Sequence, residues 1–258
     1  MMNSVASMLK RISDSLQHRG VIRTLMVCVM GILNLILRDD RVTAYRERRF
    51  DRKFGVDTAG IIRHDDLNIK DALRMHATLY QATQPALLEK TLAELQIDYQ
   101  EFTFVDFGCG KGKVLLLASS FPFKKIIGVE LAADLRDIAR ANLKKYAPKK
   151  QLCKEMEIVG MDAAEFLIPP WPLVCYFYNP FKEEIMIKVL NNIEQSLNRH
   201  PRDVVIVYVY PELDYLLQNR SFLQTVRRRD WCSIYRSNCR TQNQLGALRN
   251  EHGAELTA

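Results

Sequence analysis

The chain has 258 residues, 48% of them hydrophobic, which is enough to bury a sizeable core in one large domain. The formal net charge is +7, and the basic excess lies in residues 1–60 and 220–258. Basic ends suit either contacts with nucleic acid or an anionic membrane, or simply solvated flanks. Six cysteines without a Cys-x-x-Cys pair predict buried free thiols in a reducing cytosol, and five scattered histidines do not indicate a metal site.

The first residues are predicted to form a basic helical extension. Residues 1–20 have the spacing of a polar amphipathic helix, and the apolar segment 24–37 follows it. With 14 residues this segment is shorter than the about 20 that span a bilayer, and basic residues on both sides argue against a secretory signal. It therefore either packs on the domain or lies at a membrane interface, in which case residues 21–53 would make a weak contact with an anionic surface.

A charged helix over residues 38–53 is predicted to end near Gly55. The next five residues, 56–60, have the composition of a turn, in which Asp57 and Thr58 would hydrogen-bond their own backbone. This turn is either a lid over a ligand or an ordinary helix cap. Further along, Thr83 is predicted to cap a helix whose first turn holds Pro85.

Residues 102–119 predict a buried strand, a tight loop and a helix. The strand is an apolar run that reaches Asp106, and the helix begins where the apolar pattern resumes. The loop between them carries glycine at three alternate positions, Gly108, Gly110 and Gly112. Glycine permits positive φ and lets a ligand lie against the main chain, so a small molecule is expected on this loop.

Two phosphate-binding motifs do not fit this loop. A dinucleotide fingerprint places its third glycine where Lys113 stands, and a P-loop requires Ser or Thr where Val114 stands. The string Asp106-Phe107-Gly108-Cys109-Gly110-Lys111-Gly112, followed by an apolar run that ends at Glu130, instead resembles the class I S-adenosylmethionine-dependent methyltransferases.

This resemblance implies S-adenosyl-L-methionine as the cofactor and gives roles to several side chains. Asp106 would lie near the cofactor ammonium, partly through water, and Glu130 would accept both ribose hydroxyls. Tyr80 and Thr83 would line the methionine end, and Asp162 would contact the adenine amino group. The alternatives are a helix cap for Asp106, a solvated strand end for Glu130 and a plain loop position for Asp162. The predicted cofactor set is completed by Gly108, Gly110, Gly112 and Asn179.

Strands and helices alternate over the rest of the chain. Helices are predicted over 133–146 and 182–198, and strands over 155–159, 172–178 and 203–210. A closing antiparallel hairpin is predicted from residues 222–228 and 231–236. The alternation predicts an α/β fold with a doubly wound, mostly parallel seven-stranded sheet, as in Rossmann-like methyltransferases. The expected parts are an N-terminal helical extension (1–60), a methyltransferase domain (61–237) and a polar tail (238–258).

The strand over 172–178 leads into Asn179-Pro180-Phe181, at the carboxyl end where open α/β sheets bind ligands. The tripeptide resembles the Asn/Asp-Pro-Pro-Tyr/Phe motif of amino-methylating enzymes but lacks the second proline. In the resulting hypothesis the Asn179 side-chain oxygen and the Pro180 carbonyl accept hydrogens of an acceptor amine, and Phe181 or Tyr178 borders the nascent cation. No general base is indicated, so the amine would arrive neutral or lose its proton to water.

Residues 78–181 also resemble the small lysine methyltransferases related to the enzyme that modifies the ATP synthase c subunit. This resemblance predicts methyl transfer to an amine such as a protein lysine. Two other hypotheses stay open: a nucleic-acid or small-molecule methyltransferase, and a non-catalytic S-adenosylmethionine-binding or membrane-associated scaffold. The protein is expected in the cytoplasm, with peripheral membrane contact as the alternative.

Overall fold

The computed structural model describes residues 40–62, 80–81, 83–148 and 150–238. The helix expected over 1–20 and the apolar segment 24–37 lie outside the described residues. The chain divides into two compact units, Met1–Arg49 and Phe50–Ala258, and the sheet and all the predicted site residues belong to the second. Within the described ranges, no helix combines the length and the apolar character needed to cross a bilayer.

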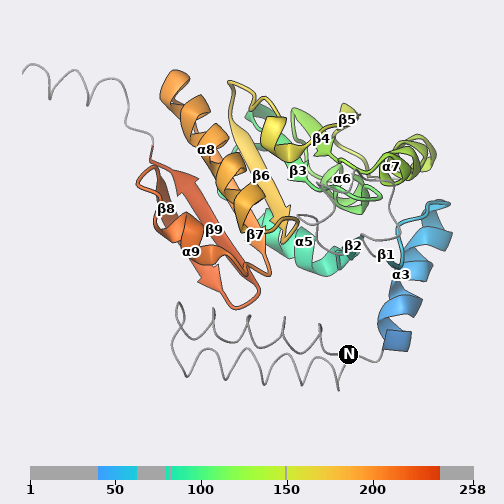
Figure 1. The fold of residues 1–258 in the computed structure, drawn as a ribbon. Coiled ribbons are helices and arrows are strands. Elements are labelled where there is room, and N and C mark those ends of the chain that lie inside the picture. The colour runs from blue at the N-terminus through green and yellow to red at the C-terminus, as the bar shows by residue number, and fades with distance from the viewer. Residues whose placement is uncertain (1–39, 63–79, 82, 149, 239–258) are drawn as a thin grey trace, which may run out of the picture. The chain divides into compact units, whose positions relative to one another are not determined.

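Seven strands form one sheet in the order β5-β4-β3-β6-β7-β9-β8 (Figure 1). The strands are β3 (Thr103–Phe107), β4 (Lys125–Val129), β5 (Met156–Val159), β6 (Leu173–Tyr178), β7 (Val204–Val209), β8 (Leu223–Arg229) and β9 (Cys232–Ser237). The first five of these in the sheet order pair in parallel, whereas β9 is antiparallel to both β7 and β8. The doubly wound, mostly parallel seven-stranded sheet and its closing hairpin are therefore confirmed.

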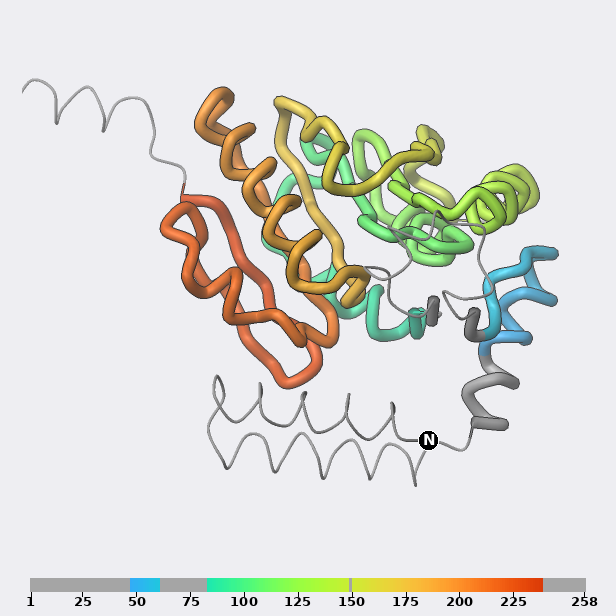
Figure 2. The backbone as a smooth tube through the Cα atoms, viewed as in Figure 1, coloured from blue at the N-terminus to red at the C-terminus, as the bar shows by residue number. Residues whose placement is uncertain are grey.

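Helices cover both faces of this sheet, as the ribbon in Figure 1 and the chain path in Figure 2 show. One face packs against α5 (Pro85–Ala93) and α6 (Lys113–Ala118), and the other against α8 (Glu183–Arg199). The remaining elements are α3 (Asp40–Phe54), α7 (Ala133–Lys145), α9 (Asp214–Gln218), the short 3-10 turns η2 (Tyr99–Glu101) and η3 (Ala163–Glu165), and the two-residue strands β1 (Ile61–Ile62) and β2 (Tyr80–Gln81).

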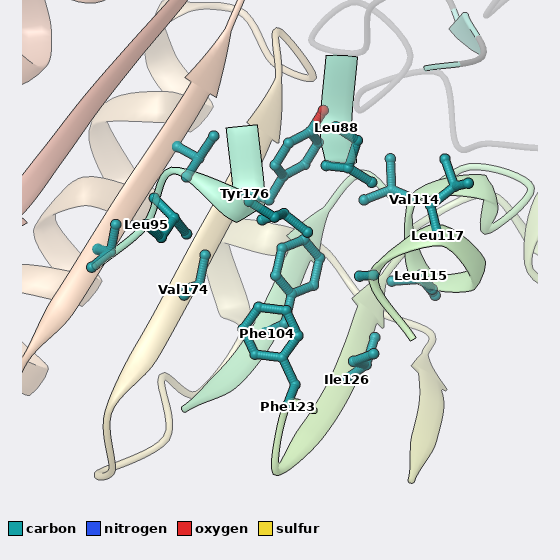
Figure 3. Packing of buried hydrophobic residues seen from close by; sticks show 14 of the residues in the cluster. Leu88, Leu95, Phe104, Val114, Leu115, Leu117, Phe123, Ile126, Val174 and Tyr176 are labelled. Atoms are coloured by element: carbon teal, nitrogen blue, oxygen red, sulfur yellow. The ribbon is translucent and has the colours of Figure 1, made fainter. Parts of the chain in front are cut away.

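Large side chains of the central strands fill the space under α5 and α6 (Figure 3). The rings of Phe104 and Tyr176, on neighbouring strands, lie 5.8 Å apart between centroids, and Phe123 packs 5.2 Å from Phe104. Burying one such side chain stabilises the fold by roughly 1.5–3 kcal/mol. Because β3 is buried on both faces, its carboxyl end and the loop that follows are held on a rigid base.

The predicted cap of α5 is wrong. Gln84, not Thr83, is the N-cap residue, it makes no side-chain capping bond, and Pro85 occupies the start of the helix. Proline at this position has a preset φ and lacks an N–H that would otherwise go unsatisfied, so the helix starts without a Thr cap. Thr83 is instead buried next to the strands.

Residues 56–60 hydrogen-bond to side chains outside the segment, whereas the sequence predicted bonds to their own backbone. The Thr58 amide and hydroxyl and the Ala59 amide all donate to the carboxylate of Asp51, at 2.8, 2.6 and 2.8 Å. The Asp57 side chain turns away from its own backbone and accepts a hydrogen bond from Lys111. A carboxylate seven and eight residues upstream thus supplies acceptors that the segment was expected to supply itself.

Candidate cofactor site

The glycine loop joins β3 to α6 at the carboxyl edge of the sheet. Gly108, Gly110 and Gly112 have φ of 78°, 54° and 82°, in the left-handed region that side chains other than glycine rarely adopt. A Cβ on Gly108 would lie 2.8 Å from the Cβ of Pro180, which no real contact allows. The loop therefore brings bare backbone against the Asn179-Pro180-Phe181 tripeptide, as a ligand-binding loop requires.

Glu130 follows the next strand, β4, and is tied to the glycine loop. Its Oε2 accepts a hydrogen bond from the Gly110 amide at 2.9 Å, and its Oε1 accepts one from the Ala132 amide at 2.8 Å. Only 8% of the residue is exposed, so it is not a solvated strand end. Burial raises the pKa of Glu130 above its ordinary value, and the two backbone hydrogen bonds oppose that rise. Since each carboxylate oxygen has a second lone pair, the group can still accept a pair of hydroxyls.

Asp106, in β3, is 2% exposed. It does not cap α6, whose N-cap residue is Gly112. Burial, and then the nearby charge of Glu130, raise the pKa of Asp106 well above its ordinary value, and no described residue supplies a hydrogen bond that lowers it. A buried acid with these surroundings is stabilised in its charged form by a cation. It therefore fits the ammonium group of S-adenosylmethionine.

Thr83 and Tyr176 lie beside this acid. Tyr176 is the register partner of Asp106 on the neighbouring strand β6. Its hydroxyl, which Figure 3 shows beside Leu88, is buried. Burial and then Asp106 raise the pKa of Tyr176, while the adjacent Thr83 side chain opposes the rise. Thr83 and Asp106 thus both lie beside Tyr176, and a contact of Thr83 with the methionine end stays a prediction. For Tyr80 the structure describes the backbone alone, in β2, so its role stays a prediction.

Asn179 ends β6 with φ of 44°, a left-handed conformation that asparagine tolerates better than most side chains. Its Oδ1 accepts a hydrogen bond from the hydroxyl of Tyr208 at 3.0 Å, and that hydroxyl accepts one from the Leu213 amide at 3.3 Å. The amide orientation at Asn179 is therefore fixed by the protein. Sequence reasoning missed Tyr208, because it looks like one more apolar residue of a buried strand.

Two aromatic pairs lie at the strand ends next to Asn179 in the chain. Tyr178 and Tyr210 meet edge to face with centroids 5.4 Å apart, at the carboxyl ends of β6 and β7. Tyr210 has φ of 47° and is 41% exposed. A non-glycine residue in this conformation costs of order 1–3 kcal/mol and marks functional sites more often than ordinary turns. Phe181 packs against Phe177 inside the domain, at 6.4 Å between centroids.

Asp162 has a local structural role. Its side chain accepts a hydrogen bond from the Ala164 amide at 2.9 Å and so caps the short turn η3. The loop alternative accounts for this contact, and a contact with the adenine amino group stays a prediction. In the part of the chain that the structure describes, no cluster of three His, Cys, Asp or Glu side chains could hold a metal ion.

The family model described as "Histone methylation protein DOT1" matches residues 61–167. A search of curated proteins gave no significant match. Among solved structures, a ribosomal protein L11 methylase from Lactobacillus delbrueckii subsp. bulgaricus is 15% identical, with a TM-score of 0.42, 58% of this chain covered and 76% of that one. A SAM-dependent methyltransferase from Aquifex aeolicus is 14% identical, with a TM-score of 0.43 and coverages of 60% and 98%.

A third structure, an RNA methyltransferase from Salinibacter ruber in complex with S-adenosyl-L-homocysteine, is 17% identical, with a TM-score of 0.37 and coverages of 61% and 92%. The segment that matches the family model contains the glycine loop, Asp106 and Glu130. This match agrees with the sheet order and with the two buried acids at the carboxyl edge. The chain is therefore an S-adenosylmethionine-dependent methyltransferase with a Rossmann-like fold.

Proposed function

We propose that the methyl acceptor is an amine nitrogen, and that a protein lysine side chain is the favoured substrate. The carrying observation is Asn179, whose side-chain oxygen is held by Tyr208 in a left-handed turn and which follows Tyr178, whose ring meets that of Tyr210. A lysine side chain is long and narrow, and its cationic head is attracted to aromatic faces.

The residues at the carboxyl edge of the sheet would position the acceptor amine. When bound, S-adenosylmethionine supplies an electrophilic methyl group on a sulfonium. Alignment of a nucleophile with such a group contributes an effective molarity of about 10⁵ M or more. The second lone pair of Asn179 Oδ1 and the Pro180 carbonyl would accept the amine hydrogens and direct the nitrogen. The ring of Tyr178 would border the positive charge, and the amine proton would leave to water.

Two resemblances support a protein substrate. The matched family model is described by methylation of a protein, histone. Residues 78–181 resemble the lysine methyltransferases of the ATP synthase c subunit type. We therefore propose, more specifically, a protein-lysine methyltransferase of this type. The basic ends of the chain favour the competing nucleic-acid acceptor, because phosphate contacts require clustered Lys and Arg.

Transfer of label from the cofactor distinguishes these acceptors. The purified chain is incubated with methyl-labelled S-adenosylmethionine and a cell lysate, and the product is divided into protease-sensitive, nuclease-sensitive and small-molecule fractions. The proposal predicts label in protein, on lysine after hydrolysis, and label that enters at least about tenfold more slowly with Asn179→Ala. Label in nucleic acid or in small molecules would contradict it, and absence of label from every fraction would favour a scaffold.

The scaffold hypothesis has a separate test, in which the full chain is compared with a chain that begins at residue 40. The shorter chain keeps Phe50 and Asp51, which contact the domain. Flotation with anionic liposomes of the full chain alone would support a membrane contact through residues 21–39. If neither chain floated, the membrane contact would be removed and a cytoplasmic protein would stay the proposal; if both floated, the contact would lie outside residues 21–39.

A further inference from the structure

A short segment after α3 is held against the glycine loop. This segment, Val56–Gly60, is called the strap below. Gly55 and Gly60, at its two ends, have φ of 66° and 97°, so the chain bends sharply before and at the end of it. In Figure 2 the strap, in blue, lies beside α7, in green. The strap precedes the loop by about fifty residues, so it reaches the loop through tertiary contacts alone.

Lys111 of the glycine loop forms the first of these contacts. Its side chain is 8% exposed, and its Nζ donates to Asp57 Oδ1 at 2.7 Å and to the Ala59 carbonyl at 3.0 Å. A nearly buried ammonium requires such partners, because desolvation without them is costly. Both oxygens belong to the strap, so the position of Lys111 depends on the strap.

Asn142 of α7 joins the same two segments from the other side. Its Oδ1 accepts from the Asp57 amide at 2.8 Å, and its Nδ2 donates to the Asp57 carbonyl at 2.7 Å and to the Lys111 carbonyl at 2.9 Å. The residue is 2% exposed, so these hydrogen bonds form away from water. One side-chain amide therefore serves backbone groups of both the strap and the glycine loop.

Further contacts keep the strap in place. The Asp51 carboxylate holds Thr58 and Ala59. Val56 is buried in a small cluster with Leu116 of α6 and Tyr146 at the end of α7. The strap is thus fixed to the domain by apolar packing as well as by hydrogen bonds.

We propose that Asp57 and Asn142 are positioning residues for S-adenosylmethionine binding and act through Lys111. Lys111 stands between two glycines with positive φ, whose backbone has many alternative conformations. The amide of the first, Gly110, must point at Glu130 to aim that carboxylate. When the strap holds Lys111, it holds Gly110 in the conformation that does so. The inference concerns cofactor binding alone and is independent of the acceptor proposed above.

Calorimetric titration of the full chain with S-adenosyl-L-homocysteine, without any acceptor, tests this role. Asp57→Ala and Asn142→Ala should each raise the Kd at least about tenfold, because each removes a hydrogen-bond partner from a buried group of the loop. Asp57→Glu keeps the charge and should return the Kd to within about threefold of the wild-type value. The matched control is Asp137→Asn, which removes an exposed carboxylate of α7 paired with Arg140 and should leave the Kd unchanged.

Thermal unfolding without ligand accompanies each titration, so that lost affinity is separated from lost folding. Asp57→Ala removes one partner of the nearly buried Lys111 and should lower the unfolding temperature, so its Kd is measured well below that temperature, where the variant is folded. A Kd of Asp57→Ala within about twofold of the wild-type value would overturn the inference. The inference would also be overturned if Asp57→Glu did not recover affinity, because the negative charge at residue 57 would then not be what holds Lys111.

Discussion

Gly108 lies directly against Pro180, so that a Cβ added to the glycine would stand 2.8 Å from the Cβ of the proline. The first residue of the glycine loop and the middle residue of the predicted acceptor tripeptide are therefore in contact with no side chain between them. A displacement at either position must be transmitted to the other, because packed backbone does not deform freely.

Gly108→Ala should impair both cofactor binding and methyl transfer at least about tenfold. The new methyl group would meet Pro180, and alanine at φ of 78° adds strain of roughly 1–2 kcal/mol. The double variant Gly108→Ala with Pro180→Gly is the control, since it keeps the strain at residue 108 and removes the Cβ that the new methyl group would meet. Calorimetry and a transfer assay measure the two effects. Equal behaviour of the two variants would show that contact with Pro180 has no importance.

Glu130→Gln should weaken cofactor binding at least about tenfold. Glutamine has one acceptor oxygen, so either the Gly110 amide or the Ala132 amide loses its partner, at a cost of about 1–3 kcal/mol. Glu130→Ala should abolish binding. Calorimetry measures the loss against Glu184→Gln, an exposed carboxylate paired with Lys188. Unchanged affinity in Glu130→Gln would contradict the assignment of this side chain to the ribose.

Asp106 makes the stability of the protein depend on pH with an unusual sign. Its pKa in the folded state is well above the ordinary 3.8, so between those two values the folded chain binds more protons than the unfolded chain. The contribution of this group to the free energy of unfolding therefore falls as pH rises through that window and is constant above it. Urea unfolding of the wild type and of Asp106→Asn at several pH values isolates the effect as a difference. A difference that does not change with pH would contradict the raised pKa.

Cofactor affinity should show the opposite dependence on pH. An ammonium group binds the ionised carboxylate, so the affinity for S-adenosylmethionine should rise as Asp106 loses its proton. Asp106→Ala should abolish binding. Calorimetry at a series of pH values measures the wild-type dependence. Affinity that fell with rising pH in the acid range would place the ammonium elsewhere.

Asn179→Ala should leave cofactor affinity within about twofold and slow methyl transfer at least about tenfold, because its Oδ1 is assigned to the acceptor. Tyr208→Phe removes one hydrogen bond to that oxygen and should have a smaller effect, of about 0.5–1.5 kcal/mol. Single-turnover rates at saturating cofactor measure the step. A normal rate in Asn179→Ala would show that the acceptor binds at another position.

The parts of the fold that the sequence predicts are those with strong local patterns. Strands β3 to β7 are continuous apolar runs bounded by turn residues, and the structure places them within about two residues of the predicted limits. Helix α9 and the pair β1–β2 have five residues and two residues each, too short for a period to appear. Pairing across the tertiary structure determines these short elements.

The site was predictable where its chemistry is local in sequence. The glycines and Asp106 stand in one string, whereas Asn142 is bonded to residues 85 and 31 positions away. On the helix α7 it resembles any polar residue near the edge of an apolar stripe. Asp57 and Lys111 are 54 positions apart in the chain, and no spacing rule relates them. Likewise, α5 begins at Pro85 with Gln84 as its N-cap residue, so Thr83 is not the cap.

The most direct test of this account is calorimetric titration of the wild-type chain with S-adenosylmethionine and with S-adenosyl-L-homocysteine. We expect one saturable binding event with each compound, and its loss in Glu130→Ala. The absence of heat with both compounds, together with a clear binding signal for a nicotinamide dinucleotide or a nucleoside triphosphate, would contradict it.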